Sequence, residues 1–200
     1  MSKPDHERIQ EAIATHRAMI AAFEASGVAT VVAMAERIVQ SLRNNGTLYL
    51  CGNGGSAADA QHIAGEFVGR FRVERRALPA VALSTDTSVL TCIGNDYDYQ
   101  SVFSRQVEAL VRPGDILWAF STSGASPNVL RAAEAARQKN ARILAFTGRT
   151  NSKLEAMADL CLCTDAAVTA RSQEIHQLAY HIICDLVEQE FCRTGDRQCR

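Results

Sequence analysis

The sequence predicts an α/β fold in which five parallel strands form a doubly wound sheet flanked by helices, with a helical hairpin at the N-terminus. Two observations predict it. Five short runs after residue 46 are apolar on both faces, which is typical of buried parallel strands. Longer stretches of helical periodicity separate these runs, and such alternation is the pattern of a doubly wound sheet. The 200 residues suit one domain, 1–200.

The first element is the expected hairpin over residues 1–45. Apolar residues recur at helical spacing from Ile9 to Phe23, and again in the stretch that follows Gly27. The break at Gly27 separates the two helices, and Asn45-Gly46 ends the second one. One broad apolar face on such a hairpin packs on its own domain or on a partner subunit.

The α/β core with its closing helix is expected over 46–192. Its predicted strands are Thr47–Cys51, Ala80–Leu83, Ile116–Phe120, Ile143–Phe146 and Leu160–Cys163, and its predicted helices are 57–69, 98–111, 127–139 and 152–158. A long closing helix is predicted over Thr169–Phe191, followed by a polar, frayed tail over 193–200. Ligands of such a sheet bind beyond the carboxyl ends of the strands, so the turns there are the first place to search for a site.

Composition narrows the functional class. The net charge is −1, whereas a protein that neutralises phosphate backbones usually carries a basic excess, so nucleic acid is not an expected partner. The N-terminus is polar and no apolar run approaches a membrane span, so no membrane association is expected. The seven cysteines are odd in number and include no C-x-x-C pair, which favours unpaired residues in a reducing cytoplasm.

The first unusual turn follows the first strand and reads Cys51-Gly-Asn-Gly-Gly-Ser-Ala-Ala-Asp59. Its glycines permit backbone conformations that aim several N–H groups at one point, and Ser56 is expected to cap the next helix. Together these features indicate an anion site, most often for phosphate. The turn matches neither dinucleotide nor nucleoside triphosphate motifs, and alone it also fits a simple strand–helix turn.

The second unusual turn follows the third strand and reads Phe120-Ser-Thr-Ser-Gly-Ala-Ser-Pro-Asn128. It offers four hydroxyl groups, and Pro127 suits the first turn of a helix. Hydroxyl and N–H groups can hold a phosphate monoester without a fixed cation. Hydroxyl-rich turns are common, but two anion-binding turns at one end of one sheet are a stronger signal than either alone.

Two pairs of side chains could carry chemistry. His62 and Glu66 lie one turn apart on one helix face, just after the glycine turn, although such a pair is more often a surface contact. Gln173 and His181 can share one side of the closing helix, because eight residues rotate the direction by only about 80°. His181 stands in an apolar stretch, where a core histidine is the commoner explanation. His176 is a further candidate by composition alone.

The two turns and their flanking segments resemble the phosphoheptose isomerase family of sugar isomerase (SIS) domain proteins. The likeness extends over nearly the whole chain, and its motifs are specific in combination. They are Cys51–Ser56, Gln61–Phe71, Leu90–Asp96, Phe103–Val107, Ser121–Ser126 and Arg171–His176. The resemblance implies the SIS fold and an aldose–ketose isomerase. It would convert sedoheptulose 7-phosphate to D-glycero-D-manno-heptose 7-phosphate through an enediol, the first step towards ADP-heptose and the heptose of lipopolysaccharide and other surface glycans.

The resemblance also implies site residues. It assigns catalysis to Glu66 as base at carbon and to His181 as acid and base at oxygen. It implies one Zn²⁺ per subunit, held by His62, Glu66, Gln173 and His181, and these residue types form a reasonable zinc set. It gives His176 no role. The implied substrate-binding residues are Asn53, Gly54, Gly55, Ser56, Glu66, Asn95, Asp96, Ser121, Thr122, Ser123, Ser126 and Gln173.

Three further expectations concern partners and alternatives. Family members build the site between subunits, so a homo-oligomer, a tetramer, is expected. A non-catalytic SIS scaffold that binds the replication initiator is the main rival, but such scaffolds lack a glutamate at the position of Glu66. Isomerisation of another phosphosugar is a third possibility. Asn95-Asp96 can also be an ordinary turn pair, and Thr85-Asp86 is a weaker candidate for the site.

Overall fold

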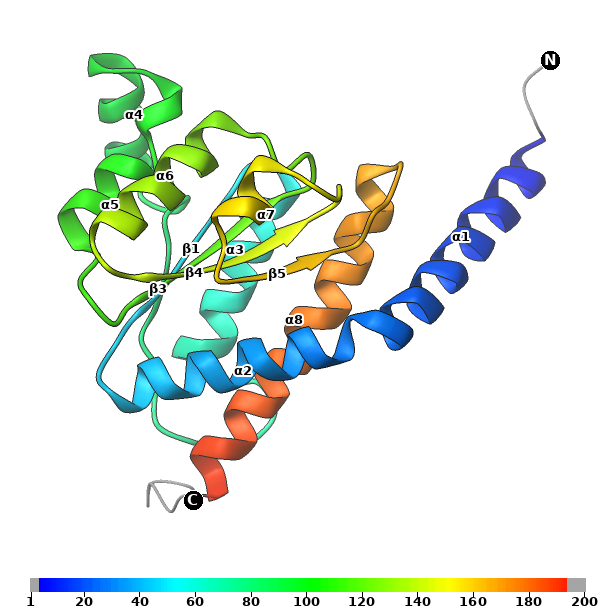
Figure 1. The fold of residues 1–200 in the computed structure, drawn as a ribbon, viewed down its shortest axis with the longest axis horizontal. Coiled ribbons are helices and arrows are strands. Elements are labelled where there is room, and N and C mark those ends of the chain that lie inside the picture. The colour runs from blue at the N-terminus through cyan, green and yellow to red at the C-terminus, as the bar shows by residue number, and fades with distance from the viewer. Residues whose placement is uncertain (1–3, 194–200) are drawn as a thin grey trace.

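The computed structural model describes residues 4–193 and has three layers, with a parallel sheet between two sets of helices (Figure 1). The strand order is β2-β1-β3-β4-β5, and all four pairings are parallel. The strands are β1 (Leu48–Gly52), β2 (Ala80–Ala82), β3 (Ile116–Ser121), β4 (Arg142–Thr147) and β5 (Leu160–Cys163). The doubly wound five-stranded fold expected from the sequence is therefore confirmed, with each strand close to its predicted bounds.

The helices divide between the two faces of the sheet. One face is covered by α2 (Val28–Arg43), α3 (Gly55–Val68) and α8 (Thr169–Arg193). The other is covered by α4 (Thr87–Asp96), α5 (Ser104–Leu110), α6 (Pro127–Gln138) and α7 (Lys153–Met157), with a short 3-10 helix, η1 (Tyr99–Ser101), beside them.

Alternation along the strands builds a core on each face. In β3, Trp118 and Phe120 point into the cluster under α2, α3 and α8, while Leu117 and Ala119 point into the opposite cluster. All four side chains are fully buried. A strand buried on both faces reads as a continuous apolar run, which is why the sequence located the sheet so closely.

The N-terminal helices differ from the expected hairpin. Helix α1 (Asp5–Ser26) meets α2 at a bend of 66°, so it runs away from the body of the protein instead of folding back along α2 (Figure 1). The physical reason is the length of the junction. Gly27 alone separates the helices, in a right-handed helical conformation, whereas an antiparallel helix pair needs a loop of about two to five residues.

Two further expectations need correction. The sequence did not predict α4, whose ten residues include Gly94 and several β-branched side chains of low helix propensity. The predicted helix 98–111 is instead the short η1 followed by α5. The predicted polar tail, apart from Arg193, lies outside the described residues. Within those residues no single helix is long and apolar enough to cross a membrane. Only α1 and α2 taken together, bent at their junction, have the length and composition of a span.

Candidate active site

The two unusual turns lie side by side at the carboxyl edge of the sheet. They follow β1 and β3, which are neighbouring strands with Gly52 paired to Phe120. The helix after β1 covers one face of the sheet and the helix after β3 covers the other. A doubly wound sheet has its ligand crevice at such a switch point. The position expected for the site from strand order alone is therefore where the two turns meet.

Glycine is required at the start of α3. Gly54 has φ +56° and ψ −122°, a conformation that side-chain-bearing residues rarely adopt, and it occupies the N-cap position. The helix begins at Gly55, so the expectation that Ser56 caps it is wrong. Because the glycine backbone makes the turn, Ser56 falls inside the first helical turn, where it is buried and packs against Gly52.

The hydroxyl-rich turn is closed by contacts between its own side chains. The Ser121 Oγ lies 2.9 Å from the Ser126 Oγ and 3.3 Å from the Ser123 Oγ. Gly124 has φ +62° and its N–H donates to the Ser121 carbonyl at 2.8 Å. Pro127 is the first residue of α6, as predicted. Three of the four hydroxyl groups thus converge in the turn itself.

A pocket of about 80 Å³ opens beside this turn and shows a residue that sequence reasoning missed. Thr122 and Ser123 line it together with Arg149, which follows β4, and with Thr169 and Ser172 from the start of α8. Arg149 supplies a positive charge beside the hydroxyl-rich turn, although the sequence predicts a phosphate site there without a fixed cation. A basic residue two positions after a strand end was the only signal, and it is too common to stand out.

A side-chain bridge joins the two turns. Asn53 and Asn128 exchange two hydrogen bonds of 2.8 Å through their amide groups, and the Tyr99 hydroxyl donates to the Asn53 Oδ1 at 3.2 Å. Asn128 is almost fully buried. The structure therefore uses Asn53 to fix the distance between the turns. Asn128 and Tyr99 were not predicted, because their role depends on pairing across 75 and 46 residues of sequence.

His62 and Glu66 form the pair that their spacing predicts. The His62 Nε2 lies 3.0 Å from the Glu66 Oε1, and their side chains are 39% and 21% exposed. Both are on α3, about two and three helical turns after the glycine turn. The carboxylate is therefore held by one neighbour on its own helix and remains open to a ligand on its other side.

His181 completes a group of three with this pair, on the facing helix α8. Its ring centroid is 5.0 Å from that of His62, in an edge-to-face arrangement, and 5.7 Å from that of Phe71, in a stacked one. Burial, with a smaller contribution from His62, lowers the pKa of His181 below its usual range, although Glu66 opposes the shift. His181 is therefore unprotonated at neutral pH and half-buried, which differs from a core histidine.

Behind His62 lie two groups that sequence reasoning missed, Tyr180 and Asp59. The Tyr180 hydroxyl lies 3.0 Å from the His62 Nδ1 and 3.4 Å from the Asp59 Oδ1. Burial raises the pKa of Asp59 to about 6 and also raises that of Tyr180. The Asp59 Oδ2 is buried without a hydrogen-bond partner among residues 4–193. This chain of contacts orients the His62 ring from the side opposite to Glu66.

Gln173 lies apart from the other three expected zinc ligands within one chain. Its amide packs against the backbone of Gly55, which leaves no room for a Cβ there. His62 is seven residues further along α3, a separation of about 10 Å along the helix axis. Among the described residues, no three His, Cys, Asp or Glu side chains are arranged around one point for a metal ion.

One chain therefore brings together only some of the four expected zinc ligands. The 3.0 Å separation of the His62 Nε2 and Glu66 Oε1 is close to the spacing of two donors on one tetrahedral Zn²⁺, about 3.3 Å for bonds of about 2 Å. The His181 ring stands beside them. These three residues fit a metal in donor chemistry, but only His62 and Glu66 already have the spacing of two ligands on one ion. Gln173 does not reach the same point from its place beside Gly55.

The remaining candidates divide between the site and ordinary structure. Asn95 and Asp96 bond to each other at 2.8 Å on the exposed end of α4. Asp86, a weaker candidate for the site, instead caps the same helix by accepting the Val89 N–H. His176 is fully buried, with its Nε2 3.1 Å from the Thr147 carbonyl oxygen, and burial lowers its pKa to about 4. It is a structural residue.

Comparison with known proteins gives a consistent picture. The SIS domain family matches residues 13–148. A phosphoheptose isomerase from Roseiflexus sp. (strain RS-1) is 56% identical over 159 residues, which is 80% of this chain and 81% of the relative. Another, from Trichlorobacter lovleyi, is 48% identical and covers 90% of this chain and 92% of its own length.

Solved structures agree with the sequence comparison. The structure of a phosphoheptose isomerase from Neisseria gonorrhoeae superposes with a TM-score of 0.88 at 44% identity, covering 93% of this chain and all of the other. One from Francisella tularensis gives a TM-score of 0.90 at 32% identity, with 94% of this chain and all of the other covered.

Proposed function

The chain belongs to the phosphoheptose isomerase family of SIS-domain proteins and is an aldose–ketose isomerase, and we propose that it converts sedoheptulose 7-phosphate to D-glycero-D-manno-heptose 7-phosphate. The observation that carries the proposal is the group formed by Glu66, His62 and His181 on α3 and α8, in a chain that also has two turns suited to an anion. A phosphosugar isomerase needs a base, a proton carrier and a phosphate anchor, and the chain offers residues for all three.

The phosphate is assigned to the hydroxyl-rich turn. Ser121, Thr122, Ser123 and Ser126 would donate to its oxygens, with Ser56 nearby and the N–H groups of Gly54 and Gly55 facing the same crevice. The mutual hydrogen bonds of Ser121 support this assignment, because a bound phosphate can replace them one for one. The sugar hydroxyls are assigned to Asn53, Gln173, Asn95 and Asp96. Asn95 and Asp96 are the least supported, since they bond to each other.

The isomerisation moves one proton between carbons and one between oxygens. Glu66 is assigned to remove a proton from C1, and the electron pair of that bond then forms the C1–C2 double bond of the enediol. His181 takes the proton of the C1 hydroxyl group and passes it to the C2 oxygen, which the lowered pKa of His181 supports because an unprotonated ring can accept it. Glu66 returns its proton to C2 as the C1 carbonyl forms.

We further propose that His62, Glu66 and His181 hold one Zn²⁺ per subunit, and that Gln173 joins them as the fourth ligand by moving away from its place beside Gly55. A bound Zn²⁺ would polarise the carbonyl and stabilise the negative charge of the enediolate. Metal analysis of the purified protein tests this: about one zinc per chain is expected, with most of it lost in His62→Ala. Zinc retained at the same level in His62→Ala would contradict the assignment.

A homotetramer is proposed for the assembly. None of the described α1 residues is buried within the chain, and Ile9 and Ile13 are 58% and 43% exposed. The apolar residues on the outer part of α1 are left in solvent by one chain, so contact with another subunit is their natural cover. The cytoplasm is the proposed compartment, because the buried cysteines Cys51 and Cys184 form no disulfide.

One assay tests the proposed activity. The protein is incubated with sedoheptulose 7-phosphate, with and without a chelator, and the heptose product is quantified. Product formation that falls on chelation supports both the isomerase and the zinc. Absence of product under either condition would contradict the proposed activity and favour a non-catalytic SIS scaffold. Product from another phosphosugar alone would correct the substrate.

A further inference from the structure

Behind the catalytic group, two opposite charges are buried together at the end of α3. The side chains of Arg75 and Glu188 are only 3% and 2% exposed. Neither has a part in the mechanism above. Charges of this kind are costly to bury unless their polar atoms find partners, so the partners they choose indicate what the pair does.

Arg75 binds the carbonyl groups that end α3. Its Nη2 donates to the Glu66 carbonyl oxygen at 2.6 Å, and its Nη1 donates to those of Phe67 at 2.8 Å and Gly69 at 3.0 Å. The last carbonyl groups of a helix have no intrahelical partner, and a cation is favourable there. Arg75 therefore fixes the helical turn whose backbone carries Glu66.

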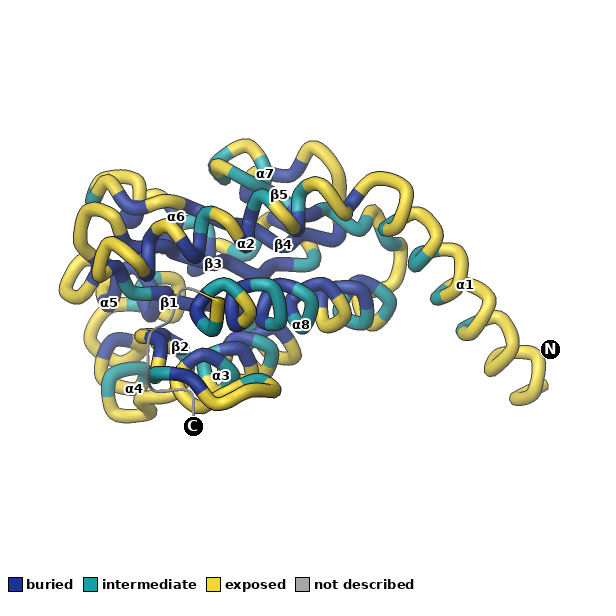
Figure 2. The backbone as a smooth tube through the Cα atoms, turned by 90° about the horizontal axis from the view of Figure 1, so that it is seen from below, coloured by how far each residue is buried: buried dark blue, intermediate teal, exposed yellow. Residues whose placement is uncertain are grey.

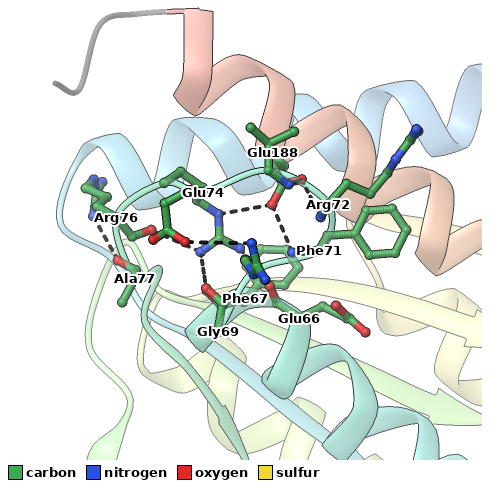
Figure 3. Close-up of polar contacts among 12 residues, drawn as sticks. Glu66, Phe67, Gly69, Phe71, Arg72, Glu74, Arg76, Ala77 and Glu188 are labelled. Carbon is green, nitrogen blue, oxygen red and sulfur yellow. Dashed lines mark hydrogen bonds and ion pairs between the residues drawn. The ribbon is translucent and has the colours of Figure 1, made fainter. Parts of the chain in front are cut away.

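Glu188 fixes the segment that follows. Its carboxylate accepts the backbone N–H groups of Phe71, Arg72 and Val73 at 2.9, 2.7 and 2.9 Å (Figure 3). Its Oε1 also lies 3.6 Å from the Arg75 Nε, an ionic contact longer than a hydrogen bond. One carboxylate on α8 thus holds three consecutive amides of the connection between α3 and β2.

The segment between α3 and β2 includes Phe71, whose ring contacts His181, the second catalytic residue. Phe71 stacks on His181 with an interplanar angle of 29°. Glu188 and His181 are seven residues apart on α8, about two turns. The segment is consequently anchored to α8 at Glu188 and leans against His181 two turns earlier on the same helix. Loss of the anchor would free the ring that bounds His181.

We propose that Arg75 and Glu188 are positioning residues of the isomerase, which set Glu66 through the end of α3 and set His181 through Phe71. The inference rests on the proposed function for its kinetic consequence. Its structural half, the anchoring of residues 71–73 and of the end of α3, stands on the contacts alone. The pair acts through other residues and does not touch the reacting atoms.

The test compares Glu188→Gln with Asp115→Asn as a matched control. Asp115 is another buried carboxylate that accepts backbone N–H groups, those of Thr47 at 2.8 Å and Arg112 at 2.7 Å. It precedes β3, where its carboxylate holds Thr47 and Arg112 and contacts neither the end of α3 nor residues 71–73. Both substitutions remove a buried charge and weaken backbone anchoring, but only one lies behind Glu66 and His181.

Kinetics with sedoheptulose 7-phosphate are measured well below the unfolding temperature of each variant. In Glu188→Gln, kcat should fall about 10- to 100-fold with KM changed less than about 3-fold, because misplaced catalytic groups lose transition-state interactions while the phosphate anchor stays. Asp115→Asn should lose thermal stability but keep the kcat of the parent. An unchanged kcat in folded Glu188→Gln, or an equal loss in Asp115→Asn, would overturn the proposal.

Two additions keep the test decisive. If Glu188→Gln does not fold, Phe71→Leu removes the ring and leaves both buried charges; its kcat should also fall, and an unchanged value would overturn the proposal.

If the parent protein has no activity, the proposed function fails, yet amide hydrogen exchange still tests the anchoring. Faster exchange at residues 71–73 in Glu188→Gln but not in Asp115→Asn supports it, and equal exchange rejects it.

Discussion

Glu66 is held on one side only, by the His62 ring one turn earlier on the same helix. A carboxylate placed in this way can accept a proton from a ligand without breaking its contact to the histidine. Its nearest expected partner in catalysis, His181, comes from a different helix. The division of the two proton-transfer roles between α3 and α8 makes each role separately testable by substitution.

Glu66→Gln should abolish isomerisation while leaving binding of the sugar phosphate intact. The amide is nearly the same size but cannot accept the carbon-bound proton, so kcat should fall by about 10²- to 10⁴-fold, the range of a lost general base. Product formation and calorimetric binding of sedoheptulose 7-phosphate measure the two effects. Glu108→Gln, at an exposed pair with Arg105 on α5, is the control and should remain active. An active Glu66→Gln enzyme would reject the role.

His176 should make the protein less stable in mild acid. The folded pKa is about 4, below the ordinary value of 6.5, because burial disfavours the charged ring. The unfolded chain therefore binds more protons between these values. The stabilising contribution is fully present above pH 6.5 and is lost as the pH falls towards 4, by about 2 kcal/mol between pH 7 and 4.5.

Denaturant unfolding of the parent and of His176→Gln at several pH values measures this contribution. The glutamine can still donate to the Thr147 carbonyl group but does not titrate. The difference in unfolding free energy between the two proteins should shrink by about 2 kcal/mol from pH 7 to pH 4.5. A difference that stays constant over this range would show that His176 is not the titrating group. Comparison with the variant is necessary because Asp59, with its pKa raised to about 6, changes stability in the opposite direction.

At the scale of single residues, local spacing predicted the contact of His62 with Glu66, because four positions along a helix always place two side chains together. It could not find Tyr180 or Asp59 beside His62. The Tyr180 hydroxyl reaches His62 across 118 residues of sequence, and only the packing of α8 on α3 creates that contact. The same holds for Asn128 opposite Asn53.

At the scale of elements, α3 contains two glycines with opposite structural demands. A Cβ at Gly55 would overlap the Gln173 amide, whereas nothing among the described residues lies within 4 Å of a Cβ at Gly65. Both positions are helical. The pair therefore separates the effect of glycine on the helix from its effect on the neighbouring helix α8.

Gly65→Ala should stabilise the protein by about 1 kcal/mol, because alanine favours the helix interior and meets no obstacle. Gly55→Ala should instead lower stability or displace Gln173, and activity should fall if Gln173 binds substrate or zinc as proposed. Thermal unfolding and the isomerase assay measure the two results for each variant. Equal behaviour of both variants would contradict the close packing of Gln173 on the start of α3.

The elements themselves show where sequence patterns suffice. The strands were predicted because both their faces are buried, which leaves continuous apolar runs such as Ile116–Phe120. Helix α4, which Asp86 caps in the structure, was missed because its periodicity is weak. Ser56 was wrongly expected to be a cap. The positive φ of Gly54 moves the helix start two residues earlier, and residue spacing does not predict a backbone angle of this kind.

At the scale of the whole molecule, α1 is the feature that one chain does not explain. Figure 2 shows it leaving the body of the protein, exposed along almost its whole length. Ile20 and Phe23 are partly buried near the junction with α2, but the same apolar stripe continues outward to Ile13 and Ile9. An apolar stripe that begins against the core and continues into solvent is typical of a surface covered by another subunit.

Ile13→Glu should therefore disrupt assembly without unfolding the domain. It places a charge on the stripe and removes an isoleucine whose burial is worth about 2 kcal/mol in each subunit. Light scattering with size-exclusion chromatography should show a tetramer for the parent and smaller species for the variant at equal concentration. Ala18→Glu is the control, since position 18 is rotated by about 140° from position 13 around the helix. A tetramer retained by Ile13→Glu, or lost equally in Ala18→Glu, would show that the stripe on α1 does not hold the subunits together.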